Sequence, residues 1–521
     1  MLILTYTLVV ILLIFLPTLL AVLWRRRVAV PWLMFCVGMA TFVGSQVYHL
    51  PLNDWLSDIG LIGPLTLDAP NWGRTAVILG LSAGLCEGIA RALGFAILRR
   101  FKQGRRWADG VMVGLGHGGI EAMILGGVLI AASFAALLPL QGSDLSVLGL
   151  EPGQLAAVER QLAALDTPLL AFAPMVERLI AMTLHVVISV MVWRAFARRN
   201  PLYFVAGVAY HSFLDATAVS MIVLDWPIWV IELVFAGLMI PGAVWLWQTR
   251  DRAQLAEAHR VTAVADEWRA FSSATRKELL QLWRTHRALV VWSVFLLFGL
   301  MSPLLAKFTP QILTMVEGAE QFADLIPEPT KADAMTQYIG NITQFGFIIA
   351  IVLGMGAVAG EKERGTAAII LSKPMSRWAF LVSKFTAQAL LYSVAFLLAA
   401  LATYYYTLVL FEPLPFAAFM FSSGLLWVWL LCFAAVTLLG STLGNSSGAG
   451  AGLGLLGAVL ILLVGTLPTI GPLAPGGLVS WAGQLGLGLE VPANAGALAA
   501  SVVLILVLIL LSLSVFEAQE V

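Results

Sequence analysis

The chain has 521 residues, of which 60% are apolar and 12% carry a charge, and its mean hydropathy is +0.91. Soluble proteins carry about 25% charged residues, so the composition excludes a soluble domain or a disordered chain and indicates a polytopic membrane protein. The 30 basic and 30 acidic residues cancel, which gives no reason to expect a nucleic-acid partner.

Long apolar runs predict the membrane-spanning helices. A helix needs about 20 apolar residues to cross the hydrocarbon core of a bilayer, and runs of that length predict an all-α protein with thirteen spans in two bundles. In chain order the expected spans are 3–24, 31–50, 74–98, 111–135, 174–196, 201–223, 227–248, 287–306, 338–360, 379–410, 417–441, 448–470 and 496–516. The first run ends in RRR (25–27) without a small-residue cleavage site, so we expect a retained span rather than a signal peptide.

Basic residues indicate the orientation. They cluster at 25–27, 99–106, 194–199 and after Trp247, which fall on one side of the membrane when successive spans alternate in direction. Short basic loops stay in the cytoplasm. The sequence therefore predicts a plasma-membrane protein with its N-terminus outside and its C-terminus in the cytoplasm.

One long polar stretch, residues 249–285, divides the chain. It separates a first domain of seven spans, residues 1–248, from a second domain of six spans, residues 286–521. Its last part leads into RKELLQLWRTHRALVVW (276–292), where leucines and tryptophans alternate with basic residues. This pattern is typical of an amphipathic helix that lies along the membrane surface.

Ionisable residues inside the first domain gather at one expected depth. At about 1.5 Å per residue, Glu87, Glu121, His185 and His211 each lie roughly 15 Å from the cytoplasmic end of their spans, near the middle of the bilayer. The segments CEGIAR, GLGHGGIEAMILGG and YHSFLDA each hold two such residues four positions apart, on one helix face. Because ionisable groups need partners away from lipid, we expect these faces to share a buried polar site.

The types of ionisable residue found at this depth suggest metal-dependent hydrolysis. Imidazole and carboxylate are ligands of zinc, and a glutamate beside the ion can act as a general base. The candidate zinc ligands are His117, His185, His211 and Asp215. The candidate catalytic residues are Glu87, Arg91, Glu121 and His211. Arg91 could keep Glu87 ionised or hold an oxyanion. The alternative is that the pairs are structural and only hold helices together.

The three segments together resemble the YhfC-type family of intramembrane metalloproteases, which is related to the prenyl-protein (CAAX) endopeptidase and PrsW-type superfamily. The resemblance covers roughly residues 1–248. Those relatives carry Glu-Glu-x-x-x-Arg or Glu-Glu-x-x-Lys, then a helix with His or Glu, then His-x-x-x-Asn or His-x-x-x-Asp. The resemblance implies that Glu87 and Arg91 match the first motif, Glu121 the ligand or base position, and His211 and Asp215 the last motif.

The chain departs from that superfamily at Cys86, which stands where the relatives have their first Glu. If that Glu is the general base, Glu87 or Glu121 has to replace it here. An inactive binding or assembly module therefore stays open as an alternative for the first domain.

In the second domain, EKERGTAAIILSKPMSRWAF (361–380) resembles the first intracellular connection of type-2 ATP-binding-cassette transporter permeases, and the amphipathic stretch resembles their first cytoplasmic helix. The positively charged residues alone would indicate an ordinary cytoplasmic loop. The resemblance, over about 265–521, implies that both segments contact an ATPase subunit. The residues expected at this contact are Arg276, Lys277, Glu278, Glu361, Glu363, Arg364 and Arg377.

The chain has no Gly-x-x-x-x-Gly-Lys-Ser/Thr phosphate loop, so the ATP site is expected in a separate subunit, with a homodimer or a second permease chain. We therefore expect a permease for ATP-driven export joined to an intramembrane metalloprotease-like domain. In the alternative function the chain is mainly an endopeptidase for membrane-embedded peptides, which the second domain would export.

Overall fold

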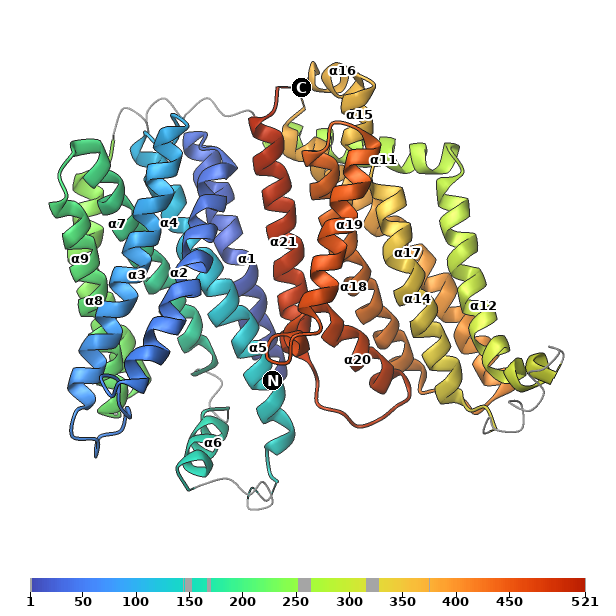
Figure 1. Cartoon of the computed structure of the whole chain (residues 1–521), viewed down its shortest axis with the longest axis horizontal. Coiled ribbons are helices and arrows are strands. Elements are labelled where there is room, and N and C mark those ends of the chain that lie inside the picture. The colour runs from blue at the N-terminus through green and yellow to red at the C-terminus, as the bar shows by residue number, and fades with distance from the viewer. Residues whose placement is uncertain are drawn as a thin grey trace. The chain divides into compact units, whose positions relative to one another are not determined.

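The computed structural model describes residues 2–143, 145, 152–165, 170–251, 264–314, 328–373 and 375–520. Within these ranges every regular element is a helix, and thirteen helices are long and apolar enough to cross a membrane (Figure 1). The predicted all-α polytopic fold is therefore confirmed.

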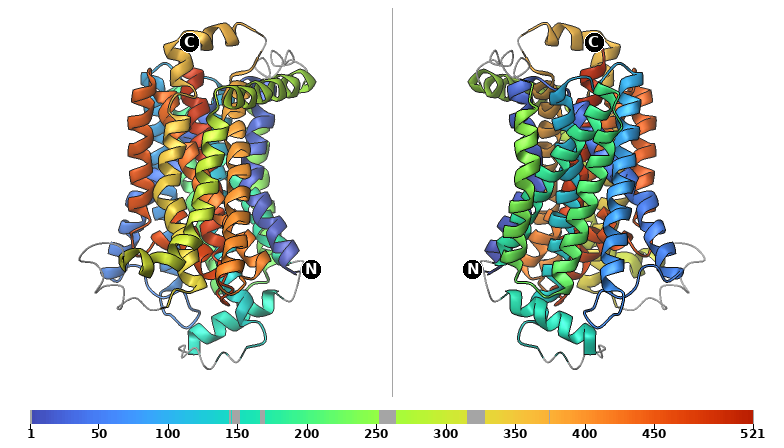
Figure 2. Two further views of the ribbon diagram at one scale, coloured as in Figure 1. Left: turned by 90° about the vertical axis from the view of Figure 1, so that its right-hand side faces the viewer. Right: turned by 90° about the vertical axis from the view of Figure 1, so that its left-hand side faces the viewer.

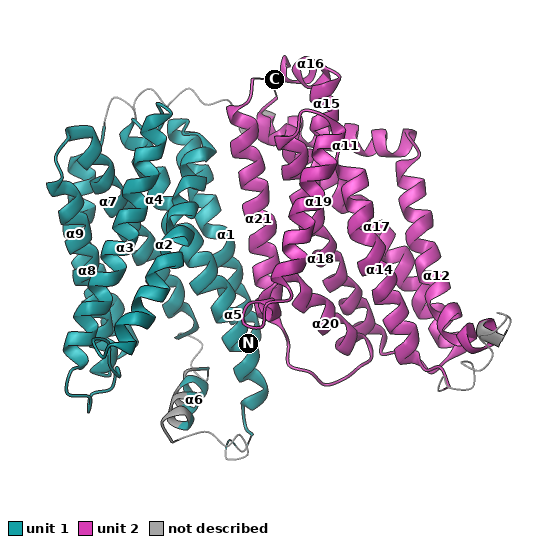
Figure 3. Ribbon diagram, viewed as in Figure 1, with its two compact units in different colours: residues 1–261 teal, residues 262–521 magenta. Residues whose placement is uncertain are grey.

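The chain forms two compact units, residues 1–261 and 262–521 (Figure 3). Seven of the candidate spans lie in the first unit and six in the second. Residues 252–263 of the predicted linker lie outside the described residues. The amphipathic helix that follows them belongs to the second unit.

The first unit consists of antiparallel spans with short helices at their ends. Its helices are α1 (Leu2–Val28), α2 (Trp32–Asp58), α3 (Trp72–Arg100), α4 (Trp107–Glu121), the π-helix η1 (Ala122–Val128), α5 (Leu129–Leu137), the 3₁₀-helix η2 (Leu138–Leu140), α6 (Pro152–Leu165), the 3₁₀-helix η4 (Leu170–Phe172), α7 (Ala173–Arg198), α8 (Leu202–Val223) and α9 (Ile228–Gln248). The fourth expected span is thus built from α4, η1 and α5, and its π-helix begins directly after Glu121.

The second unit places an amphipathic helix across the ends of its spans. Its helices are α11 (Val264–Arg284), α12 (Arg287–Thr314), α14 (Lys331–Gly354), α15 (Ala359–Glu363), α16 (Thr366–Leu371), α17 (Arg377–Leu410), α18 (Phe416–Leu443), α19 (Ser447–Val464), the 3₁₀-helix η5 (Gly471–Leu473), α20 (Pro475–Gly486) and α21 (Ala495–Ala518). Figure 2 shows α11 nearly perpendicular to the spans of its own unit. The short helices α15, α16 and α20 were not separate elements in the sequence prediction.

Hydrogen bonds to nearby side chains, and one glycine, determine where several helices begin or end. The backbone N–H of Arg106 donates to Asp109 Oδ2 at 2.9 Å, which caps α4, and the N–H of Thr330 donates to Asp333 Oδ2 at 2.7 Å, which caps α14. A side-chain oxygen in this position satisfies a backbone N–H that the helix leaves free. Gly365 separates α15 from α16 with a φ of +68°, a conformation that favours glycine.

Glycines allow α4 to pack tightly against its neighbours. A Cβ atom on Gly116 would lie 2.0 Å from the carbonyl oxygen of Phe35 in α2, and one on Gly114 would lie 2.4 Å from the Cα atom of Val186 in α7. Small residues let helix backbones approach closely in membranes, where packing rather than the hydrophobic effect drives helix association. The glycines beside His117 thus bring α2 and α7 close enough for a shared site.

The core of the second unit is α18. Its most apolar stretch is 72% buried, the largest share among the candidate spans of the described chain. It packs against α14, α17, α19, α20 and α21. The surrounding spans expose their other faces, as expected for helices that face lipid.

We expect Gly116→Ala to destabilise the protein by about 1–3 kcal/mol, because the added methyl group collides with the α2 backbone. The measurement is thermal unfolding of the full-length protein in detergent. Gly237→Ala in α9 is the matched control, since its Cβ would have no neighbour within 4 Å. Equal unfolding temperatures for the two variants would contradict the packing described for α4.

Candidate metal centre and charge network

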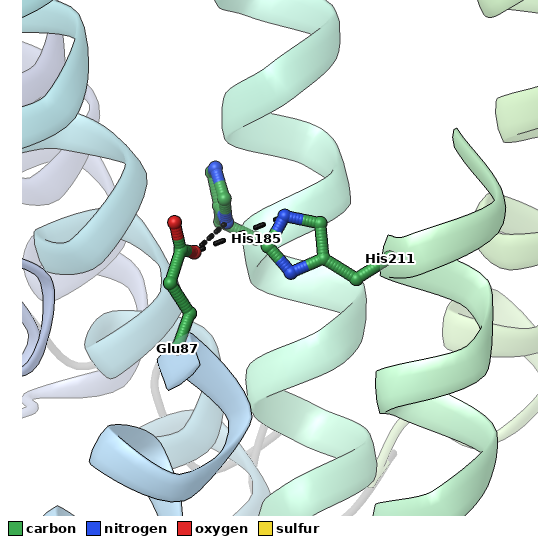
Figure 4. Close-up of side chains that lie close together, drawn as sticks. All are labelled: Glu87, His185 and His211. Carbon is green, nitrogen blue, oxygen red and sulfur yellow. Dashed lines mark ion pairs between the residues drawn. The ribbon is translucent and has the colours of Figure 1, made fainter. Parts of the chain in front are cut away.

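The site residues predicted from four separate spans meet at one buried site in the first unit. Glu87 and Arg91 come from α3, His117 and Glu121 from α4, His185 from α7, and His211 and Asp215 from α8. All except Asp215 are at most 9% exposed, and the side chain of Asp215 is 35% exposed. Figure 4 shows three of them, Glu87, His185 and His211, pointing toward one another from their helices.

Glu87 is the centre of this cluster. Its Oε2 atom lies 3.0 Å from His117 Nε2 and 3.2 Å from Arg91 Nη2. The same oxygen lies 3.8 Å from His211 Nε2 and 3.9 Å from His185 Nδ1. One carboxylate oxygen thus faces three imidazoles and a guanidinium.

The hydrogen bonds of His117 determine its tautomer. The hydroxyl of Thr41 donates its one hydrogen to the Gly38 carbonyl at 2.7 Å, so its oxygen accepts from His117 Nδ1 at 2.9 Å. This assignment leaves a lone pair on Nε2 of the neutral ring. His117 Nε2 and Glu87 Oε2 are then both hydrogen-bond acceptors, and the two atoms lie only 3.0 Å apart. A proton or a cation therefore has to lie between them.

His185 is oriented in a similar way by partners on its two sides. Arg91 Nη2 lies 2.6 Å from His185 Nδ1, and because a guanidinium only donates, Nδ1 is the acceptor. The ring hydrogen is then on Nε2, which lies 2.5 Å from Glu121 Oε2.

Further charged groups surround the imidazoles. Arg178 Nη1 donates to Glu121 Oε1 at 2.8 Å, and the same guanidinium pairs with Glu177. His211 Nε2 lies 3.3 Å from Asp215 Oδ2. Thr41 and Glu121 thus contact the second ring nitrogens of His117 and His185, whereas Asp215 contacts the same Nε2 of His211 that faces Glu87. Such outer partners commonly orient histidines that bind a metal ion.

The donor atoms fit a metal ion. Two ligands of a tetrahedral zinc ion stand about 3.4 Å apart, because each lies about 2.0–2.2 Å from the metal. Glu87, His185 and His211 offer atoms that lie within 4.8 Å of one another, and so do His117, Glu121 and His185. The Nδ1 atom of His211 is also buried without a hydrogen-bond partner in the described part of the chain. This donor set suits zinc or a similar transition metal.

Arg91 occupies part of the same space. Its Nη2 atom contacts both Glu87 Oε2 and His185 Nδ1, which are two of the candidate ligand atoms. The side chain is fully buried, yet its Nε and Nη1 atoms have no hydrogen-bond partner among the described residues. A metal ion that takes both ligand atoms requires Arg91 to give up these contacts.

Sequence reasoning missed two residues of this site. Thr41 in α2 carries no charge, so no depth count could single it out. Arg178 was visible as an ionisable residue of the fifth span, but its pairing with Glu121 depends on the rotation of α4 against α7. His49 in α2 is not part of this cluster and bonds to Ser82 and Asn53 at 3.3 and 3.1 Å.

In the second unit, three of the residues predicted to contact an ATPase subunit form one charge network with Lys384. Lys384 Nζ lies 2.8 Å from both Glu278 Oε1 and Glu361 Oε1, and Lys277 Nζ lies 2.8 Å from the same two oxygens. Lys384 was not among the predicted residues; its side chain is 2% exposed. The network ties α11 to α15 and α17.

The residues of the second unit that were predicted to contact an ATPase differ in how deeply they are buried. Glu361 is 4% exposed and faces lysines of its own chain. Partial burial lowers the pKa of Lys277, but the carboxylates of Glu278 and Glu361 outweigh it and raise the pKa, so the ammonium is charged at neutral pH. Arg276 and Arg364 are exposed.

Two other predicted residues bond within the unit. Glu363 accepts from the backbone N–H of Ser447 at 3.1 Å, and Arg377 donates to the carbonyl oxygens of Phe516 and Gln519, the latter at 2.7 Å. They hold α15 and α17 against α19 and the end of α21.

The fold and the two sites define an integral membrane protein of two units, with a buried histidine and glutamate cluster in the first and a charge network in the second. The family model for the YhfC intramembrane metalloprotease matches residues 12–235, and the model for the ABC-2 family transporter protein matches residues 273–521. Both resemblances seen in the sequence are thereby confirmed, and the chain is a fusion of a YhfC-type domain with an ABC-2-type domain.

Two curated proteins of Bacillus subtilis (strain 168) are similar to parts of the chain. The uncharacterized transmembrane protein YxlG is 29% identical over 190 residues, which cover 35% of this chain and 72% of YxlG. The uncharacterized membrane protein YhfC is 28% identical over 223 residues, which cover 39% of this chain and 79% of YhfC.

We expect Thr41→Val to weaken metal binding by about 10- to 100-fold, because His117 loses the acceptor that fixes its tautomer. The measurement is a competitive chelator titration of the full-length protein in detergent. Thr217→Val, which removes a hydroxyl bonded to the Phe213 carbonyl in α8, is the control. Unchanged affinity in Thr41→Val would rule out His117 Nε2 as a ligand atom.

Proposed function

We propose that the first unit is a zinc-dependent intramembrane endopeptidase and that the second unit is the permease of an ATP-driven exporter. The observation that carries the first part is the convergence of His117, His185 and His211 on the carboxylate of Glu87. The YhfC-type family supports a metal at this site.

The three histidines would hold the ion. His117 offers Nε2 and His185 offers Nδ1, because Thr41 and Glu121 engage their other nitrogens. When bound, zinc would polarise the scissile carbonyl and lower the pKa of a water molecule.

Glu87 is the best candidate for the general base. Its Oε2 atom already lies among the three imidazoles, where it can accept a proton from water and return it to the leaving amine. Arg91 would keep Glu87 ionised, and its two unpaired nitrogens can donate to the carbonyl oxygen of the peptide.

The contacts favour supporting roles for the other two predicted residues. Glu121 is held by Arg178 and in turn orients His185, so we assign it to positioning rather than to proton transfer. Asp215 lies against His211 Nε2 and orients that ring. Both assignments narrow the prediction from sequence, in which Glu121 was a candidate base and Asp215 a candidate ligand.

Arg91 supports a second candidate function. In its present position the guanidinium satisfies Glu87 and His185 without any metal ion. The cluster would then be a set of ion pairs that fixes the packing of α3, α4 and α7, and the first unit would be a binding or assembly module. The two functions differ in whether the purified chain holds stoichiometric metal.

For the peptidase, we expect about one zinc ion per chain, and we expect Glu87→Gln to lower cleavage of a membrane-embedded fluorogenic peptide by about a hundredfold or more. Metal content by mass spectrometry and initial cleavage rates in nanodiscs are the measurements. Glu232→Gln is the control, because Glu232 is a buried carboxylate of α9 that forms no ion pair with these histidines in the described structure.

If the first unit is instead an assembly module, the expected results are the opposite. This function predicts no stoichiometric metal and no cleavage by the unaltered chain, and it predicts that Arg91→Met lowers the unfolding temperature because the carboxylate of Glu87 loses its cationic partner.

For the permease, a separate ATP-binding-cassette subunit would contact the exposed basic residues of α11 and of the α15–α16 turn. Arg276 and Arg364 have exposed side chains, whereas Glu361 is buried in the charge network that holds these two segments together. A second copy of this chain or another permease chain would complete the exporter, in the plasma membrane with the N-terminus outside. Its cargo would be a peptide released by the first unit.

We expect the double charge reversal Arg276→Glu and Arg364→Glu to lower co-purification of the ATPase subunit by about tenfold or more, since opposed like charges at an interface cost several kcal/mol. The measurement is the ratio of ATPase to permease after affinity purification from native membranes. Arg269→Glu, at an exposed position of α11, is the control. If no ATPase accompanies the unaltered chain, the ATP-driven exporter is excluded.

A further inference from the structure

A cavity of about 360 Å³ lies beside the charge network of the second unit, where α11, α14, α15 and α17 meet the start of α12. Pockets of about 300–1,000 Å³ are typical of sites for small ligands. Of the two exposed residues proposed to contact an ATPase, only Arg364 lines this cavity, and the metal centre belongs to the other unit.

The inner wall of the cavity presents two buried acceptor atoms. Glu361 Oε2 and Gln388 Oε1 are buried and have no hydrogen-bond partner in the described part of the chain. The two residues are only 4% and 5% exposed. The other oxygen of Glu361 is taken by Lys277 and Lys384. Because a buried acceptor without a donor is costly, these two atoms favour a ligand that donates several hydrogen bonds.

The rim of the cavity carries unpaired positive charge. Arg287 and Arg364 line the cavity and are exposed, and neither forms an ion pair with a carboxylate of the described residues. Lys384 also lines the cavity, but Glu278 and Glu361 neutralise it. Two free guanidinium groups are a suitable site for phosphate, which they bind through paired N–H donors.

The cavity reaches the outer surface of the span α14. Val352 lines it and is 59% exposed, as expected for a residue in contact with acyl chains. Leu280 and Trp283 on the neighbouring helix α11 are 42% and 52% exposed. An amphipathic helix with such residues lies at the boundary between headgroups and acyl chains, so a phospholipid can enter headgroup first.

We propose that this cavity binds the phosphoethanolamine headgroup of a membrane phospholipid. The ammonium group donates to Glu361 Oε2 and Gln388 Oε1, and the phosphate lies between Arg287 and Arg364. The order of the groups fits the lipid, because the ammonium is the end farthest from the acyl chains. Phosphocholine lacks ammonium hydrogens, and phosphoglycerol lacks the positive charge.

The first test uses the unaltered full-length chain. Native mass spectrometry after release from nanodiscs measures retained lipid for phosphatidylethanolamine, its monomethyl and dimethyl forms, phosphatidylcholine and phosphatidylglycerol with the same acyl chains. Retention is expected to fall stepwise as methyl groups replace ammonium hydrogens, by about tenfold between the first and the fourth lipid. Soluble phosphoethanolamine at millimolar concentration should compete.

The second test uses variants of the cavity wall and rim. Gln388→Met removes the acceptor at similar volume and should lower phosphatidylethanolamine retention about tenfold, whereas Gln388→Glu keeps an acceptor and should preserve it. Arg287→Gln should weaken retention of every phospholipid. The control is Arg284→Gln, at an exposed position of α11.

Two results would overturn the proposal. One is equal retention of phosphatidylcholine and phosphatidylethanolamine by the unaltered chain. The other is unchanged retention in both Gln388→Met and Arg287→Gln variants that unfold at the temperature of the unaltered protein.

Discussion

The carboxylate of Glu87 is the interaction on which the first unit depends. A buried charge without partners is very costly, and Glu87 is 6% exposed in the middle of a membrane span. Arg91 from its own helix, His117 from α4, and His185 and His211 from α7 and α8 surround one oxygen of this group. Removing α4, α7 or α8 would take away one of the partners of this charge. The same requirement therefore holds the bundle together and assembles donors that can bind a metal ion.

In the second unit, too, a buried charge is surrounded by groups of opposite charge. This charge lies where α11 crosses the ends of the spans. Lys384 is almost fully buried and remains favourable only because Glu278 and Glu361 both contact it. Trp268 and Phe271 of α11 also pack on Trp378 at the start of α17, with ring centroids 5.9 and 5.5 Å apart. Charge pairing and aromatic contacts thus fix the amphipathic helix against α15 and α17.

Much of this arrangement follows from the sequence alone. Hydropathy gave the spans, and the spacing of four between Glu87 and Arg91 correctly placed both on one helix face. Counting residues along each span also brought Glu121, His185 and His211 to one depth. Depth does not determine how a helix is rotated about its axis, however, and rotation decides that His117 meets Glu87 while Glu121 turns to His185. That rotation depends on glycine contacts between helices far apart in sequence, so the partner residue Thr41 was not predictable.

Charge balance explains why Cys86 is compatible with a metal site. The described cluster contains four carboxylates, from Glu87, Glu121, Glu177 and Asp215, and two guanidinium groups, from Arg91 and Arg178. If all six groups were ionised, two negative charges would remain, which one divalent cation would neutralise. A glutamate in place of Cys86, which is 3% exposed, would add a third negative charge beside Glu87. With the neutral thiol of Cys86 at this turn of α3, a single carboxylate would serve as the base of the proposed peptidase, and one bound divalent ion would balance the cluster.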